Sequence, residues 1–185
     1  MTDKKTNLYT QQFRNSGAYT YVITDRDSKE CLILDPVAGQ LDLIDILIDQ
    51  QDLTVKYAMD SHTHSDHYTG LSEVKEEWDA TLIGFEKSNS CRCEKFLKND
   101  DSIFLGNSEL KVRHIGGHTE DSIIIIGEGM VFTGDTLLIG KTGRTAQNVN
   151  DIRQLYRGIL INIMSLPNDT LVYPSHDYDN LLFSS

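Results

Sequence analysis

Apolar and polar positions along the chain follow two different periods. Short apolar runs, and runs in which apolar and polar residues alternate, are typical of β-strands, whereas apolar residues three and four apart are typical of amphipathic helices. The helical spacing predicts helices at residues 41–50, 71–78 and 151–166. The short apolar or alternating runs predict strands at residues 9–13, 18–24, 31–36, 55–60, 80–85, 103–105, 110–115, 122–126, 130–133 and 170–173.

The helix at residues 151–166 has the strongest signal. Asn150 is a suitable N-cap and Pro167 is expected to end the helix. Its apolar positions follow the spacing i, i+3, i+4, i+7, i+8 and i+11, at Ile152, Leu155, Tyr156, Ile159, Leu160 and Ile163. The strands between residues 103 and 133 are close together and predict an antiparallel meander, whereas residues 86–101 are charged and predict an irregular surface segment.

Composition narrows the class of protein. The chain has 185 residues, 39% of them hydrophobic, with only 3 prolines and 13 glycines, so we expect residues 1–185 to form a single domain. The net charge of −11 argues against nucleic acid as a partner, because phosphates are bound by basic surfaces. No apolar run reaches transmembrane length, and residues 1–7 lack the apolar stretch of a signal peptide.

Three cysteines, Cys31, Cys91 and Cys93, are too few for a disulfide framework. The spacing Cys91-x-Cys93 is tight for a structural bridge, so we expect reduced thiols. Together with the absence of a signal peptide and of a membrane span, this predicts a soluble protein of the cytoplasm.

Residues 60–67 contain the densest chemistry in the chain. The segment reads Asp60-Ser61-His62-Thr63-His64-Ser65-Asp66-His67, with three of the six histidines and two carboxylates, directly after a predicted strand. His62 and His64 are two residues apart, so their imidazoles point the same way if the extended backbone continues. Clustered imidazoles and carboxylates gain little without a cation, and we interpret the segment as part of a metal site.

Three more stretches end strands with a residue that can bind a metal. His118 follows Gly116 and Gly117, Asp135 follows Gly134, and His176 lies after the last strand. Glycine before Asp135 would let the backbone approach the site closely. One metal centre explains five of the six histidines together. The sixth, His114, lies within a strand, and we expect it to be structural or exposed.

This order of residues resembles the metallo-β-lactamase superfamily. The resemblance implies an α+β fold, an αββα sandwich in which two mixed β-sheets carry helices on their outer faces and loops at one edge hold the metal. Many members bind two metals. In this chain one metal would take the positions of His62, His64 and His118, the other those of Asp66, His67 and His176, with Asp135 between them.

Residues 132–139, 143–145 and 175–178 are most similar to the persulfide dioxygenases of that superfamily. This similarity implies one Fe(II) per chain, held by His62, His118 and Asp135, and oxidation of glutathione persulfide or a similar persulfide by O₂ to sulfite and thiol. Two histidines and one carboxylate leave open positions on iron. The remaining candidates, His64, Asp66, His67 and His176, would orient these ligands by hydrogen bonds.

On the substrate side, Arg144 is a candidate for binding a substrate carboxylate and Tyr178 for lining the sulfur pocket. The chain departs from the family pattern here in two ways. Ala146-Gln147-Asn148 stand where the family has an acidic residue, and the sequence ends at Ser185, where members generally continue. As partners we expect a small thiol or persulfide and O₂, and neither nucleic acid nor a membrane. A homodimer is possible.

Two other functions fit the same residues. A thioester hydrolase of the hydroxyacylglutathione hydrolase (glyoxalase II) type would use two zinc ions or mixed metals at all seven ligand positions, with a metal-activated hydroxide as the nucleophile. A non-catalytic metal-binding or sulfur-sensing module is the alternative from another class. Metal content and O₂ consumption would distinguish the three.

Overall fold

The first β-sheet has six strands. In a computed structural model, which describes residues 6–15, 17–88, 93–145 and 148–178, their order is β1-β2-β3-β4-β5-β6. The first three strands are antiparallel and β3 to β6 are parallel, so the sheet is mixed. The strands are β1 Leu8–Asn15, β2 Ala18–Asp25, β3 Glu30–Leu34, β4 Thr54–Met59, β5 Thr81–Phe85 and β6 Lys95–Leu97.

The second sheet has five strands in the order β11-β10-β9-β8-β7. The four strands from β7 to β10 form the predicted antiparallel meander, and β11 adds to β10 in parallel. This sheet is therefore also mixed. The strands are β7 Ser102–Leu105, β8 Ser108–His114, β9 Ile123–Gly127, β10 Met130–Gly134 and β11 Leu171–Pro174.

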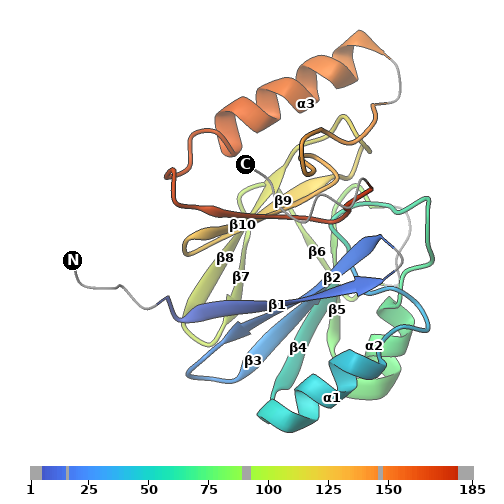
Figure 1. Ribbon diagram of the computed structural model, residues 1–185, viewed down its shortest axis with the longest axis vertical. Coiled ribbons are helices and arrows are strands. Elements are labelled where there is room, and N and C mark those ends of the chain that lie inside the picture. The colour runs from blue at the N-terminus through green and yellow to red at the C-terminus, as the bar shows by residue number, and fades with distance from the viewer. Residues whose placement is uncertain (1–5, 16, 89–92, 146–147, 179–185) are drawn as a thin grey trace.

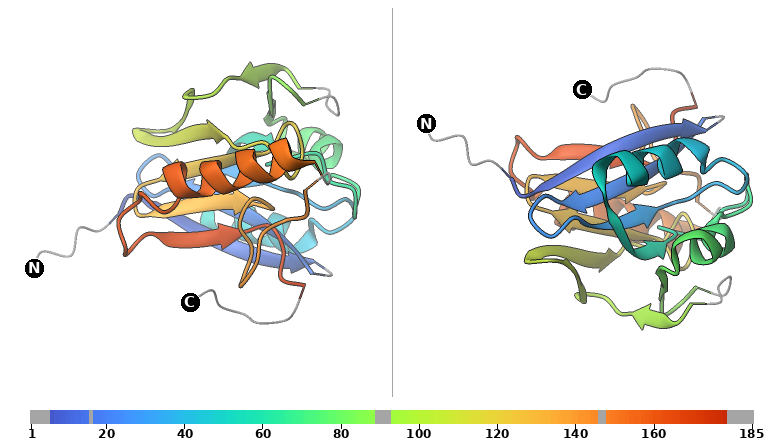
Figure 2. Two further views of the ribbon diagram at one scale, coloured as in Figure 1. Left: turned by 90° about the horizontal axis from the view of Figure 1, so that it is seen from above. Right: turned by 90° about the horizontal axis from the view of Figure 1, so that it is seen from below.

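The two sheets face each other, and helices cover their outer faces (Figure 1, Figure 2). Side chains of both sheets, among them Tyr21, Leu34 and Phe132, fill the space between them. Helices α1 (Asp42–Gln51) and α2 (Leu71–Trp78) pack on the first sheet. Helix α3 (Val149–Asn162) packs on the second. The expected αββα sandwich is confirmed.

Two predicted elements differ from the structure. Within the segment expected to be irregular, β6 pairs with β5, which a strand of three residues barely signals in sequence. Helix α3 begins after Asn148, whose side chain accepts a hydrogen bond from the Asp151 amide, so the predicted N-cap at Asn150 is wrong. The helix ends at Asn162, and the turns that follow bring the chain to Pro167.

The cysteines also depart from the expectation. Cys31 is free and buried in β3, where burial raises the pKa of its thiol to about 12. Cys93 is disulfide-bonded, so the prediction of a reduced thiol is wrong at that position, and Cys91 lies outside the described residues. No helix in the described ranges is long and apolar enough to cross a membrane.

Candidate metal centre

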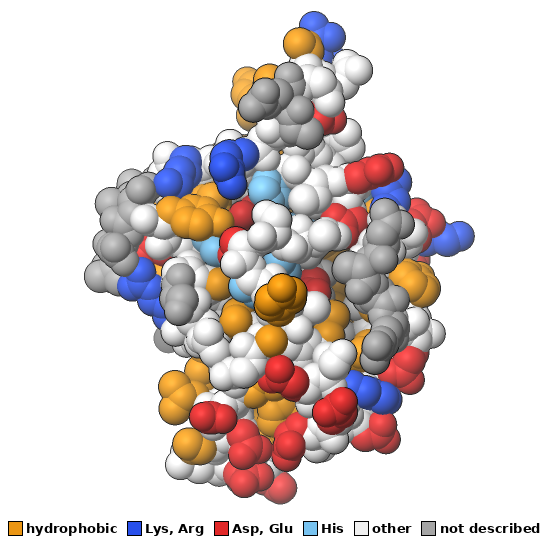
Figure 3. Space-filling model, turned by 90° about the vertical axis from the view of Figure 1, so that its right-hand side faces the viewer, with side chains coloured by type: hydrophobic (Ala, Val, Ile, Leu, Met, Phe, Trp, Pro, Cys, Tyr) orange, Lys and Arg blue, Asp and Glu red, His pale blue; other side chains and the backbone are white. Residues whose placement is uncertain are grey.

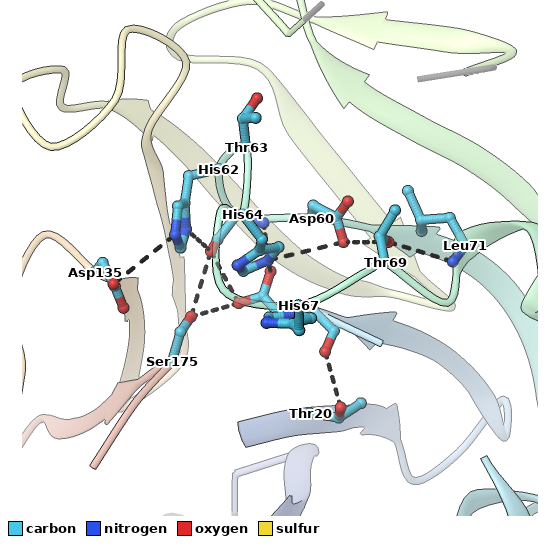
Figure 4. Close-up of polar contacts among 12 residues, drawn as sticks. Thr20, Asp60, His62, Thr63, His64, His67, Thr69, Leu71, Asp135 and Ser175 are labelled. Atoms are coloured by element: carbon cyan, nitrogen blue, oxygen red, sulfur yellow. Dashed lines mark hydrogen bonds and ion pairs between the residues drawn. The ribbon is translucent and has the colours of Figure 1, made fainter. Parts of the chain in front are cut away.

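The loop that follows β4 is held in place by a buried carboxylate, Asp35, at the end of β3. Asp35 accepts hydrogen bonds from the Ser61 amide at 2.6 Å and the Ser61 hydroxyl at 2.8 Å (Figure 4). It also accepts one from the Ser175 hydroxyl at 2.5 Å, which comes from the end of β11 in the other sheet. Burial opposes its ionisation, but hydrogen bonds and the charge of His64 lower the pKa of Asp35. Asp35 thus fixes the loop and joins the two sheets beneath the site.

Three predicted ligands converge above this support. His62, His118 and Asp135 each offer an atom, and these atoms lie within 4.8 Å of one another. The Oδ2 atom of Asp135 is 4.0 Å from His62 Nε2 and 3.5 Å from His118 Nε2. In Figure 4 the His62 ring points toward Asp135. Two atoms that bind one ion at bond lengths of about 2.0–2.2 Å lie at most twice that distance apart. Both distances from Asp135 satisfy this limit, so the triad fits a metal.

The other nitrogen of each triad histidine is already engaged. His118 Nδ1 donates to the carbonyl of Arg144 at 2.7 Å, which leaves Nε2 unprotonated in the neutral ring. His62 Nδ1 is hydrogen-bonded to the Ser61 hydroxyl at 2.9 Å. Burial, and then the charge of His64, lowers the pKa of His62 to about 3, so its ring is neutral at pH 7. Neutral imidazoles oriented through Nδ1 are the form that binds metal through Nε2.

Glycines allow the backbone to approach the triad closely. Gly134 has φ +52°, and a Cβ there would lie 2.8 Å from the Ser61 hydroxyl. Gly143 donates its amide to the Asp135 carbonyl at 2.8 Å, and a Cβ on it would lie 2.1 Å from that same oxygen. The predicted role of Gly134 is therefore supported, and Gly143 was not recognised from sequence.

A second group of ligand-competent residues lies beside the triad. His64, Asp66 and His67 also offer atoms within 4.8 Å of one another. His67 Nδ1 is 2.9 Å from Asp66 Oδ2, whereas His67 Nε2 and His64 Nδ1 are buried and have no hydrogen-bond partner among the described residues. Unpaired buried nitrogens are costly unless something binds them. This group, too, fits a cation or a ligand.

His176 joins the two groups. Its Nδ1 is 2.6 Å from Asp135 Oδ1 and its Nε2 is 2.8 Å from Asp66 Oδ2. Burial lowers the pKa of His176, but its hydrogen bonds to Asp135 and Asp66 and their charges outweigh burial and raise it. Because both nitrogens face carboxylates, His176 holds two candidate ligands, Asp135 and Asp66, in position.

His64 belongs to a further acidic group that the sequence did not reveal. Its Nε2 lies 3.3 Å from Asp35 Oδ1 and 4.0 Å from Asp60 Oδ1. Burial works against the charged ring, but Asp35 and Asp60 raise the pKa of His64 to about 9. Burial raises the pKa of Asp60 to about 7, although the charge of His64 lowers it.

Two residues that support the site, Asp35 and Ser175, were not predicted from the sequence. Only the position of Asp35 at a strand end before a proline could have indicated it.

A pocket of about 350 Å³ opens over the triad. Its walls include both predicted substrate residues, Arg144 and Tyr178, together with Leu138 and Lys141. The Tyr178 ring stacks on His176 at 4.8 Å with an angle of 7° between the planes. Figure 3 shows histidines at the surface of this face, with cationic side chains beside them. All nine predicted site residues thus lie in or directly beside one site.

The fold and the convergent ligands define a metal-binding αββα sandwich. The chain belongs to the metallo-β-lactamase superfamily, whose family model matches residues 14–88 and 92–176. It is 32% identical over 181 residues to the mitochondrial persulfide dioxygenase ETHE1 of Mus musculus, covering 96% of this chain and 71% of that protein.

A solved structure and a hydrolase are also similar to this chain. The crystal structure of ETHE1 from Myxococcus xanthus superimposes with a TM-score of 0.86 at 34% identity, covering 93% of this chain and 77% of that one. The hydroxyacylglutathione hydrolase of Psychromonas ingrahamii is 29% identical over 170 residues, covering 90% of this chain and 64% of that protein. Two of the three functions considered from sequence, the persulfide dioxygenase and the hydroxyacylglutathione hydrolase, are therefore represented among the similar proteins.

Proposed function

We propose that the protein is a persulfide dioxygenase with one Fe(II) held by His62, His118 and Asp135. The observation that carries the proposal is the contrast between the triad and His176. The triad nitrogens face a shared carboxylate at distances suited to a common ion, whereas both nitrogens of His176 are taken by carboxylates. Similarity to two ETHE1 proteins supports the same assignment.

The reaction would consume a persulfide, O₂ and water, and release a thiol and sulfite. Bound iron supplies the oxygen chemistry that side chains cannot. The protein positions the reactants: Tyr178 and Leu138 line the pocket above the triad, and the Arg144 guanidinium is suited to a carboxylate on the thiol carrier. His64, Asp66 and His67 border the same ligands and would tune them through hydrogen bonds.

A dinuclear thioester hydrolase is the second candidate, favoured by one specific observation. The buried nitrogens of His64 and His67 that lack partners lie beside Asp66, as the ligands of a second metal would. Relatives described as hydroxyacylglutathione hydrolases match at 29% identity. In that case a hydroxide between two metals would attack the thioester.

Metal analysis of protein purified without oxygen, followed by two assays, tests the proposal. The expected result is about one iron per chain, with O₂ consumption and sulfite release on addition of glutathione persulfide. About two zinc ions per chain with thioester hydrolysis would replace the proposal by the hydrolase. Bound metal without either activity would replace it by a non-catalytic module.

A further inference from the structure

A second hollow, of about 440 Å³, lies between α3 and the end of β8. Four side chains of α3 bring N–H donors to it: the guanidinium groups of Arg153 and Arg157 and the amides of Asn150 and Gln154. No aspartate or glutamate is among the described residues that line it. We call this hollow the α3 groove.

The two arginines are unusual in so acidic a protein. The chain carries 28 aspartates and glutamates and a net charge of −11. Within the described ranges, however, neither Arg153 nor Arg157 makes an ion pair or a hydrogen bond. The Asp151 carboxylate, on the same helix, accepts a hydrogen bond from the side-chain amide of Asn148 at the helix start. Both arginines are exposed, so this charge is available to something outside the chain.

Their spacing suits one shared ligand. Arg153 and Arg157 are four residues apart, so they lie on neighbouring turns of one helix face. Like charges at this spacing destabilise a helix, and an anion between them removes the repulsion. A guanidinium presents a planar fork that matches a phosphate or carboxylate oxygen pair, and two forks match a group with two negative charges.

We propose that the α3 groove binds the phosphate group of a small organic phosphate. A phosphate ester carries about −1.5 to −2 charges at pH 7 and three acceptor oxygens, which match two guanidinium groups and the neighbouring amides. The rest of the lining consists of His114, Gly158 and two apolar residues, Ile115 and Ile161. The exposed side chain of Ile161 would contact the organic part of the ligand, which distinguishes such a molecule from inorganic phosphate.

The groove is separate from the metal pocket, although both adjoin the loop that carries His118. Gly117 lies between His118 and the first turns of α3, where a Cβ would be 2.6 Å from the Asp151 carbonyl. None of the donors of the α3 groove is a proposed metal ligand. Binding in the groove can therefore be tested independently of the reaction at the metal.

Titration of the zinc-loaded protein with phenyl phosphate tests the proposal. At constant ionic strength we expect saturable binding to one site with a dissociation constant on the order of 1 mM. Inorganic phosphate should bind several times more weakly, because it has no organic part to contact the exposed Ile161. NMR shifts should change most at the side-chain amides of Asn150 and Gln154.

A pair of charge-matched variants provides the control. Arg153→Gln with Arg157→Gln should weaken phenyl phosphate binding by roughly tenfold or more. Lys95→Gln with Lys98→Gln, which removes the same charge from exposed positions around β6, should leave it unchanged. Equal losses in the two double variants, absence of saturation, or shifts confined to the metal pocket around Gly143 would each overturn the proposal.

Discussion

The two ends of the sandwich both use buried carboxylates to join the sheets, but they satisfy them differently. At the end away from the site, Asp25 of β2 accepts hydrogen bonds from Asn7 at 2.5 Å and from the Ser28 amide and hydroxyl, each at 2.8 Å. A further bond from the Ser108 hydroxyl, at 2.6 Å, comes from β8 in the other sheet. Neutral donors thus occupy both oxygens of Asp25.

At the site end, the carboxylate of Asp135 faces imidazoles instead. One oxygen pairs with His176, while the other lies 3.5 Å from His118 and 4.0 Å from His62. The last two distances are too long for good hydrogen bonds and leave space for an ion. A carboxylate whose two oxygens accept hydrogen bonds from neutral donors therefore stabilises the fold. A carboxylate with one oxygen facing two imidazole nitrogens across a gap is available to bind an ion. The variants below test this difference.

The largest effect is expected for His118→Ala, which removes a triad ligand from the loop between β8 and β9. Bound metal should fall to near zero, and activity by more than about 10³-fold, because the metal supplies the chemistry. The fold should persist, since the core between the sheets is untouched. Metal analysis measures the bound metal, and circular dichroism tests whether the fold persists. His114→Gln is the matched control, because His114 binds the Glu120 carbonyl and stacks on Phe85 outside the site. Equal metal loss in that control would contradict the triad.

An intermediate effect is expected for His176→Ala. This histidine positions Asp135 and Asp66 rather than binding metal in our proposal, so iron should stay bound while turnover falls about 10–100-fold, as is typical when a group behind a metal ligand is lost. Metal content and turnover, measured on the same preparation, separate the alternatives. Loss of one of two metals per chain would instead indicate the dinuclear hydrolase.

The sequence indicated which residues converge at the candidate site better than it indicated the contacts that hold them there. His62, His118 and Asp135 are visible because residue types that bind metals follow apolar strands at these positions. The roles of Asp35 and Ser175 depend on hydrogen bonds between segments 140 residues apart, which no local pattern encodes. The occupation of both His176 nitrogens is likewise visible only in three dimensions.

The fold shows the same limit at the ends and edges of elements. The long amphipathic pattern of α3 located the helix, but two nearby asparagines, Asn148 and Asn150, compete as N-cap, and only backbone geometry selects the first. Half of the predicted apolar positions of this helix are exposed in the structure: Ile152, Tyr156 and Leu160. Periodicity therefore predicts that a helix is amphipathic, but not how wide a stripe the sheet covers.

The smallest effect is expected at the opposite end of the sandwich, for Asp25→Asn in metal-free protein. Burial opposes ionisation of Asp25, but hydrogen bonds from Ser108 and Ser28 outweigh it and lower the pKa of its carboxyl. A lowered pKa contributes stability above the unfolded value of about 3.9, and this contribution is lost as the pH falls through the folded pKa. The variant should therefore be less stable than the wild type at pH 7, and the difference should shrink below about pH 4.

Urea unfolding at pH 7 and at pH 3 measures this difference. Asp27→Asn, which removes the same charge from an exposed neighbour, is the control and should show a smaller difference at pH 7. Metal binding by Asp25→Asn should equal that of the wild type, because Asp25 lies at the other end of β2 from the site. If the difference in stability were the same at both pH values, or if metal binding fell, the two ends of the sandwich would not differ in the way proposed here.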